Sequence, residues 1–288
     1  MLTISITGYI IINMPLTIFT ISSREFKNSI SNHYLLGMTV LLATLALALV
    51  LLGDTPFGTT GASPLSMQIT SLSSLSIFFI PLMALFMSYD AIVGEHEQGS
   101  LLLILSYPVK RYQFILGKFL ANWLSLLIAI VFGYGLIFTM IFLKTNNITM
   151  ELINAYLTLI GTSILLGGVF IAFAYLVSAI VDKRSTAIIY CIAIWLFFII
   201  FFDMLLLIIL VSESSYLISA NVLSNLLLLN PVDVFRIASI GEQGNNLLPL
   251  QTLSNISTLP QLVSVSALVL WILVPLNTAI YLFKKKVL

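Results

Sequence analysis

Long stretches without a charged side chain constrain the fold of this chain more than any other feature. Five stretches of at least 25 residues contain no Asp, Glu, Lys or Arg, and they cover residues 28–53, 55–89, 119–143, 152–181 and 243–283. A sixth, residues 185–212, is interrupted only by Asp203. A helix needs about 20 mainly apolar residues to cross the hydrocarbon core of a bilayer. The sequence therefore predicts an all-α integral membrane protein with six transmembrane helices.

Composition agrees with this prediction and excludes several classes of function. Hydrophobic residues make up 60% of the chain and charged residues 8%, against about 25% charged in an average soluble domain. The formal net charge of +1 gives no strong field for a nucleic acid or a polyanionic substrate. After the polar ends are trimmed, the expected spans of a domain covering residues 34–288 are about 34–53, 70–89, 116–143, 155–181, 186–211 and 262–283.

The distribution of basic residues predicts the orientation of these spans. Lys and Arg collect in cytoplasmic loops, and both termini are expected in the cytoplasm. Ten of the twelve then lie inside: Arg24, Lys27, Lys110, Arg111, Lys118, Lys183, Arg184, Lys284, Lys285 and Lys286. Only Lys144 and Arg236 fall outside, and shifting the frame by one span would reverse nearly all of this bias.

Residues 1–33 are expected to form an N-terminal extension and an interfacial (elbow) helix. Polar residues such as Asn13 and Thr17 interrupt the apolar residues of this segment, which is typical of a helix lying at the membrane surface. A seventh span over residues 1–22, with the N-terminus outside, is the alternative. It leaves every later loop on the same side, so the charge count does not distinguish the two.

A cytoplasmic segment, residues 90–111, lies between the second and third expected spans. Gly94 and Gly99 loosen the chain, an apolar run of five residues (101–105) follows, and Pro108 disfavours helix at the residue before it. We expect one short helix, with acids before it and bases after it as its dipole favours. Such a helix suits a groove on a partner protein, although an amphipathic loop lying on the lipid surface fits equally well from physics alone.

Residue spacing in this segment resembles the signature of ABC-2 type transporter permeases. The matching residues are Glu95-x-x-x-Gly99-Ser100-Leu101, then Leu105-Ser106-x-Pro108-Val109-x-Arg111, then Gly117-Lys118; Leu102 departs from the pattern, because the family often has an acid there. The resemblance implies that the segment is a coupling helix seated on a separate ATP-binding ABC subunit. It implies ATPase-coupling roles for Asp90, Glu95, Glu97, Gly99, Ser100, Leu101, Leu105, Pro108 and Arg111.

A narrower resemblance adds expectations about partners. Residues 89–95 together with residues 226–236 look like the permeases of the nitrous-oxide reductase maturation system. This implies a bacterial inner-membrane protein that pairs with a second copy of itself and with a periplasmic partner protein, and that supports assembly of copper centres. ATP and Mg would be bound by the partner subunit, with no cofactor or metal in this chain. The chain has no G-x-x-x-x-G-K-[ST] phosphate loop, so any ATP must be hydrolysed by another subunit. No H-E-x-x-H or G-x-S-x-G motif is present either, and we expect this chain not to be an enzyme.

The segment 213–261 is expected on the outside and is long enough to form a docking platform. Asn230, Pro231 and Asp233 follow one another in helix-starting order, and Arg236 lies three residues beyond Asp233. These four residues are the candidates for docking an external partner on a short external or re-entrant helix. The alternative is a structured loop without a partner.

Asp203 is the only acid inside an expected span, where an ionisable group costs several kcal/mol or finds a partner. It could line a substrate path or relay protons, or it could hold helices together. A stand-alone proton-coupled secondary transporter built on Asp203 is therefore the alternative function, although the internal repeats typical of that class are not evident.

Overall fold

The computed structural model of the chain describes residues 6–52, 64–106, 109–144, 150–211, 225–240 and 260–286. Within these ranges the regular structure is helical, which confirms the all-α prediction there. The elements are α1 (Ile6–Ser31), α2 (Tyr34–Leu52), α3 (Pro64–Ser88), α4 (Val93–Glu97), α5 (Ser100–Ser106), α6 (Arg111–Lys144), α7 (Met150–Ile180), α8 (Arg184–Leu196), the π-helix η1 (Phe197–Phe201), α9 (Phe202–Val211), α11 (Pro231–Ile240) and α13 (Gln261–Lys285).

Helix length and apolarity confirm an integral membrane fold. Five helical stretches of the described residues could each cross a bilayer: Ile69–Glu97, Arg111–Met140, Met150–Ile180, Arg184–Ile209 and Gln261–Lys285. A sixth span arises if Thr17–Ser31 and Leu35–Ala48, which meet at a bend of 62°, count as one. The alternative of a seventh span over residues 1–22 falls largely on residues whose side chains lie outside the described part of the chain, and it stays a prediction.

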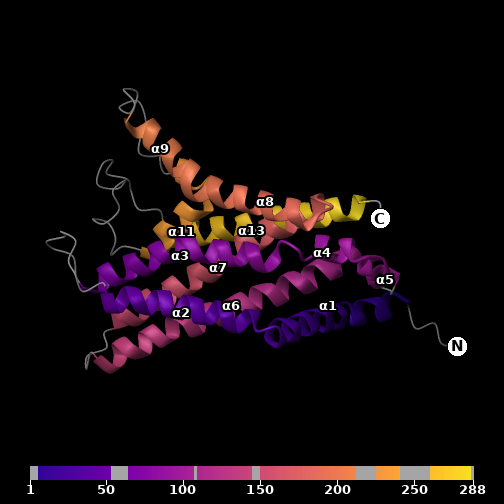
Figure 1. The fold of residues 1–288 in the computed structure, drawn as a ribbon, viewed down its shortest axis with the longest axis horizontal. Coiled ribbons are helices and arrows are strands. Elements are labelled where there is room, and N and C mark those ends of the chain that lie inside the picture. Colours follow the sequence, from indigo (N-terminus) through magenta and orange to yellow (C-terminus); the bar gives the residue numbers. More distant parts are fainter. Residues whose placement is uncertain are drawn as a thin grey trace.

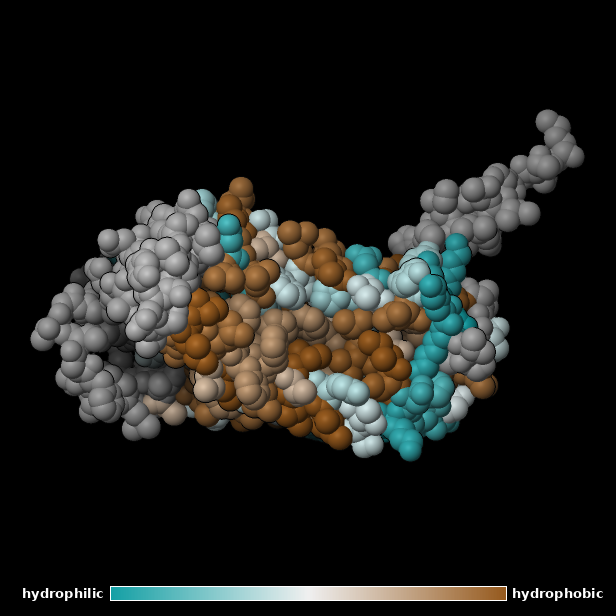
Figure 2. Space-filling model, turned by 90° about the horizontal axis from the view of Figure 1, so that it is seen from above, coloured by the Kyte–Doolittle hydropathy of each residue, from teal (hydrophilic) through white to brown (hydrophobic). Residues whose placement is uncertain are grey.

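The long helices lie side by side along one axis, and the two ends of the bundle differ (Figure 1). The helices α4 and α5 lie at the end where α1 begins and α13 finishes, whereas α9 diverges from its neighbours at the opposite end. Figure 2 shows hydrophobic side chains over the flank and a band of hydrophilic ones at the α4–α5 end. The bundle therefore has an apolar belt with one strongly polar end.

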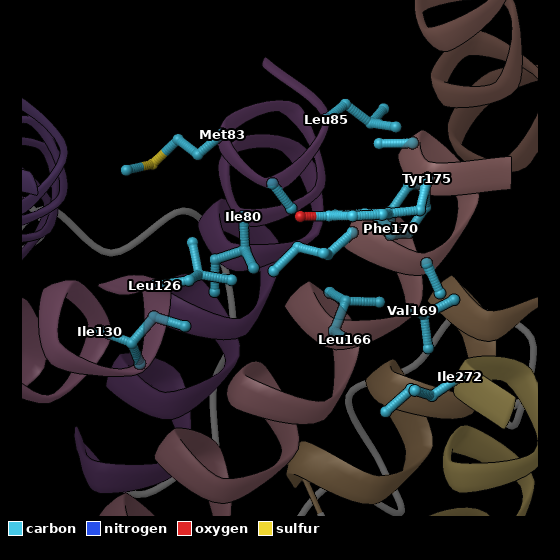
Figure 3. Close-up of a cluster of buried hydrophobic side chains, with 14 of the residues drawn as sticks. Ile80, Met83, Leu85, Leu126, Ile130, Leu166, Val169, Phe170, Tyr175 and Ile272 are labelled. Atoms are coloured by element: carbon cyan, nitrogen blue, oxygen red, sulfur yellow. The ribbon is translucent and has the colours of Figure 1, made fainter. Parts of the chain in front are cut away.

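The core is built around α7, which packs against α3, α6 and α13. Of its most apolar stretch 72% is buried, against 17% for the α8–α9 stretch, which is even more apolar; the difference arises because α3, α6, α11 and α13 all pack against α7. Figure 3 shows side chains of α7 packed among those of its neighbours. The α7 residues are Leu166, Val169, Phe170 and Tyr175; their neighbours are Ile80, Met83 and Leu85 of α3, Leu126 and Ile130 of α6, and Ile272 of α13. A β-carbon at Gly167 would lie 2.0 Å from Leu126 Cδ2, so this glycine sets how closely α6 approaches α7.

Candidate functional site

The short helix α5 places two leucines on the surface at the polar end of the bundle. Leu101 is buried at 1% exposure, whereas Leu102 and Leu103 are 61% and 67% exposed. Leu103 also lines an open cleft of about 1250 Å³ between α1 and residues 86–109. Leu101, one of the predicted coupling residues, therefore packs α5 against the bundle. Leu102 and Leu103, which the sequence analysis did not single out for coupling, form the exposed surface of α5. The side chain of Leu105 and all of Pro108 lie outside the described residues.

Gly99 makes the turn that separates α5 from α4. Its φ of +72° lies in the left-handed region that L side chains rarely adopt. The Ser100 hydroxyl donates to the Glu95 carbonyl at 3.3 Å, and the backbone carbonyl of Asp90 accepts the Gly94 N–H at 2.8 Å. Gly99 and Ser100 therefore shape this turn by local geometry, whereas Asp90 makes its bond at the start of α4.

Glu95 belongs to a buried ion network rather than to a free surface. The Lys118 ammonium pairs with Glu95 and, at 3.1 Å, with Glu25, and it donates to the Ala91 carbonyl at 3.0 Å. The Lys118 side chain is only 9% exposed. One cation therefore ties α1, α4 and the first turns of α6 together.

Glu97 contacts the start of α8. The backbone N–H of Arg184 donates to Glu97 Oε1 at 2.9 Å, and its guanidinium lies 3.6 Å from the other oxygen. A carboxylate at a helix N-terminus satisfies an unpaired donor and the helix dipole. The Arg184 guanidinium also donates to the Gly94 carbonyl at 3.0 Å, so α4 and α8 hold each other at both ends of α4.

Arg111 does not stabilise the C-terminus of α5, as the sequence analysis expected of the bases that follow the short helix. Arg111 begins α6, and its guanidinium donates to the carbonyls of Phe283 and Lys286 at 2.8 Å each. A cation at the last carbonyls of a helix is favourable, but the helix is α13.

The last described residue, Lys286, contacts the loop between α7 and α8 at this end of the bundle. Its ammonium donates to the Val181 carbonyl at 2.9 Å and lies 2.7 Å from Asp182 Oδ1. This ammonium lowers the pKa of the Asp182 carboxyl below its usual value. Together with Arg111 it fastens the end of α13 to both α6 and the α7–α8 loop, contacts that no sequence pattern indicated.

At the other end of the bundle, α11 begins as the sequence predicted. Asn230 Oδ1 accepts the Val232 N–H at 3.0 Å, and Pro231 occupies the first helical position. The Asn230 amide also donates to the Phe198 carbonyl at 3.0 Å, so it supports the π-helix η1 as well. Asn230, Pro231 and Asp233 are buried, and a partner would touch the surface they support. Docking itself stays a prediction, and residues 212–224 and 241–259 lie outside the described part of the chain.

Asp203 has a partner that the sequence analysis missed. The Arg236 guanidinium lies 3.1 Å from Asp203 Oδ2 and 2.7 Å from Asp233 Oδ1. Asp233 is 1% exposed, and one cation therefore pairs with an acid of α9 and an acid of α11. This geometry favours the interpretation of Asp203 as a residue that holds helices together. The described residues contain no group of three His, Cys, Asp or Glu side chains able to hold a metal ion.

Comparison with known proteins identifies the class of this fold and site. The family model described as "ABC-2 family transporter protein" matches residues 19–288, so the chain belongs to the ABC-2 family, and it is a permease subunit of an ABC transporter. It is similar to the "Probable ABC transporter permease protein NosY" of Pseudomonas aeruginosa, with 38% identity over 228 residues, 79% of this chain and 82% of that protein. The protein of the same name from Stutzerimonas stutzeri is 35% identical over 273 residues, 93% of this chain and 98% of that protein. The predicted family resemblance is confirmed.

Proposed function

We propose that this chain is the NosY-like permease of an ATP-driven transporter, and that a separate ATP-binding subunit docks on α5. The observation that carries the proposal is the pair of exposed leucines, Leu102 and Leu103, on a helix fixed at the polar end of the bundle. Exposed apolar side chains outside the apolar belt suit a groove on a partner. ATP and Mg are bound and used by that partner, so this chain is not itself an enzyme.

The polar end faces the cytoplasm of a bacterial inner membrane in this proposal. Cationic side chains collect on the cytoplasmic side of membrane proteins. The end that carries α4, α5 and the last turn of α13 also carries Lys118, Arg111 and Arg184, while Arg236 is at the other end. Both termini are then cytoplasmic. Residues 34–288 form the permease domain, and α1 lies within the N-terminal extension.

ATP binding drives movement through α5. Within the described residues one copy carries one coupling segment and five or six spans, so we infer that two copies pair, each with its own ATP-binding subunit. Closure of the two ATP-binding subunits displaces both α5 helices and shifts the spans between inward-facing and outward-facing states. The Lys118 ion network joins α4 to α1 and α6. Because α5 follows α4 directly, a displacement of α5 is passed to these helices.

The outer end serves a periplasmic partner protein of the nitrous-oxide reductase maturation system. The two relatives carry the NosY name, and α11 is fixed there by Asn230 and by the Arg236 ion pairs. In this proposal the permease supports assembly of the reductase's copper centres. A stand-alone proton-coupled transporter is the weaker hypothesis, because the Asp203 carboxylate is already engaged by a guanidinium.

The test is affinity purification from native membranes in mild detergent, with co-purifying proteins identified and ATP hydrolysis assayed. Leu103→Asp places a charge on the exposed face of α5 and should abolish recovery of the ATPase. Leu262→Asp is the matched control, because Leu262 is 82% exposed but lies at the start of α13, at the other end of the bundle. Equal recovery with Leu103→Asp and wild type would refute docking on α5.

A further inference from the structure

Residues 89–92 connect α3 to α4, and this α3–α4 junction leaves backbone groups that its own helices do not satisfy. Ile92 and Val93 direct their N–H groups to the Ser178 hydroxyl of α7, each at 3.0 Å. Ser178 is 0% exposed. A single oxygen of α7 therefore accepts two adjacent amides at the point where the membrane-spanning helix turns into the coupling segment.

Two further side chains bind the neighbouring carbonyls. Lys118 of α6 donates to the Ala91 carbonyl, and Arg184 of α8 donates to the Gly94 carbonyl, each at 3.0 Å. The end of the junction and the start of α4 thus present four consecutive residues, 91–94, to side chains of three different helices. A β-carbon at Gly94 would lie 2.8 Å from Arg184 Nη2, which shows how closely the guanidinium covers this backbone.

These bonds determine what moves with α5. A buried amide or carbonyl that loses its partner costs more than the bond itself contributes. A displacement of α4 and α5 is therefore expected to carry α6, α7 and α8 with it rather than to leave Ile92 and Val93 unpaired. Of these helices α7 is the most deeply buried and contacts α11 at the outer end.

We propose that Ser178 is a positioning residue for ATP-driven coupling: it passes the displacement of α5 into α7, with Lys118 and Arg184 as its partners on α6 and α8. The proposal rests on the proposed function. It assigns Ser178 a role that its position within a transmembrane span does not suggest.

Ser178→Ala removes the acceptor while leaving the volume almost unchanged. Ser163→Ala is the matched control, because Ser163 lies on the same helix, is equally buried, and its hydroxyl has no hydrogen-bond partner among the described residues. The measurement is hydrogen–deuterium exchange of the purified complex with its ATPase, with and without ATP. Two peptides are followed, one covering residues 89–99 and one covering α11.

We expect Ser178→Ala to co-purify with the ATPase and hydrolyse ATP at nearly the wild-type rate. Without ATP, exchange of the Ile92 and Val93 amides should rise about fivefold or more, the ratio that corresponds to one lost hydrogen bond. The ATP-dependent change in the α11 peptide should be largely lost, an effect that a purely structural role would not produce. Ser163→Ala should match wild type throughout.

A full ATP-dependent change in α11 with Ser178→Ala would overturn the proposal. If Ser178→Ala does not fold, Arg184→Gln gives the same test, because this half-exposed side chain can be shortened without opening the core; an unchanged α11 response would again overturn it. Absence of any co-purifying ATPase with the unmodified protein would instead refute the proposed function, and that result is visible before any variant is made.

Discussion

Lys118→Met tests the ion network that holds the coupling segment. The substitution keeps an apolar stem of similar length but leaves the carboxylates of Glu95 and Glu25 without their shared cation. Removing one partner of a buried ion pair costs about 3–5 kcal/mol. The side chains of Glu95 and Glu25 are 19% and 28% exposed, so water screens part of this penalty and the lower limit, about 3 kcal/mol, applies.

The chain carries its own reporter of unfolding. Cys191 is the single cysteine and is 3% exposed, so a thiol-reactive fluorophore labels it only as the bundle opens. A loss of about 3 kcal/mol corresponds to a decrease in melting temperature of roughly 6 °C or more for a chain of this size. Lys118→Met combined with Glu95→Gln should recover part of this loss, because it removes one of the two orphaned charges.

Lys110→Met is the control. The Lys110 side chain is exposed, so this substitution should leave the melting temperature within about 1 °C of wild type. Equal melting temperatures for Lys118→Met and Lys110→Met would show that the network does not stabilise the fold. A double variant no more stable than Lys118→Met alone would refute the explanation by orphaned charge.

Three further predictions use the same labelling assay or tryptophan fluorescence. Gly167→Val should destabilise the bundle by about 1–3 kcal/mol, because its β-carbon would overlap a side chain of α6; an unchanged melting temperature would contradict the tight α6–α7 contact. Arg236→Met should cost about 3–5 kcal/mol, since it leaves Asp233 buried and unpaired, and Arg236→Met with Asp233→Asn should be more stable than the single variant. Lys286 lowers the pKa of Asp182, so the small stabilisation from this exposed pair is present at neutral pH. It is lost as the pH falls below about 4 through the folded-state pKa. The melting temperature of Asp182→Asn should lack this part of the pH dependence.

The sequence predicted those features that depend on local composition. Uncharged stretches located the long helices, since crossing a bilayer requires them. The apolar run at residues 101–105 between Gly99 and Pro108 predicted a short helix, and α5 covers Ser100–Ser106. Likewise, the cap formed by Asn230 and Pro231 predicted the first residue of α11. These are properties of a few neighbouring residues, so one sequence is enough to infer them.

Features that depend on packing between distant helices could not be predicted in this way. Glu95 was interpreted as an acid that precedes the short helix and favours its dipole, yet its partner is Lys118 in the next span. Asp203 was left open between two roles because nothing local identifies Arg236 as its partner. Ser178 is one serine among many in apolar helices, and its two amide donors become apparent only once α3 and α7 are side by side.

The π-helix η1 allows the helix to hold one residue more without changing which side of α9 carries its acid. A π-turn contains one residue more than the α-helical turn it replaces, so its five residues rotate the chain about as far as four α-helical residues do. Deleting one residue from Phe197–Phe201 should therefore restore α-helical geometry and leave Asp203 facing Arg236, whereas deleting one residue from the regular helix after it would rotate Asp203 by about 100° away from Arg236. The pairing of α9 with α11 is thus expected to tolerate a change of length within this phenylalanine-rich run better than elsewhere in the span.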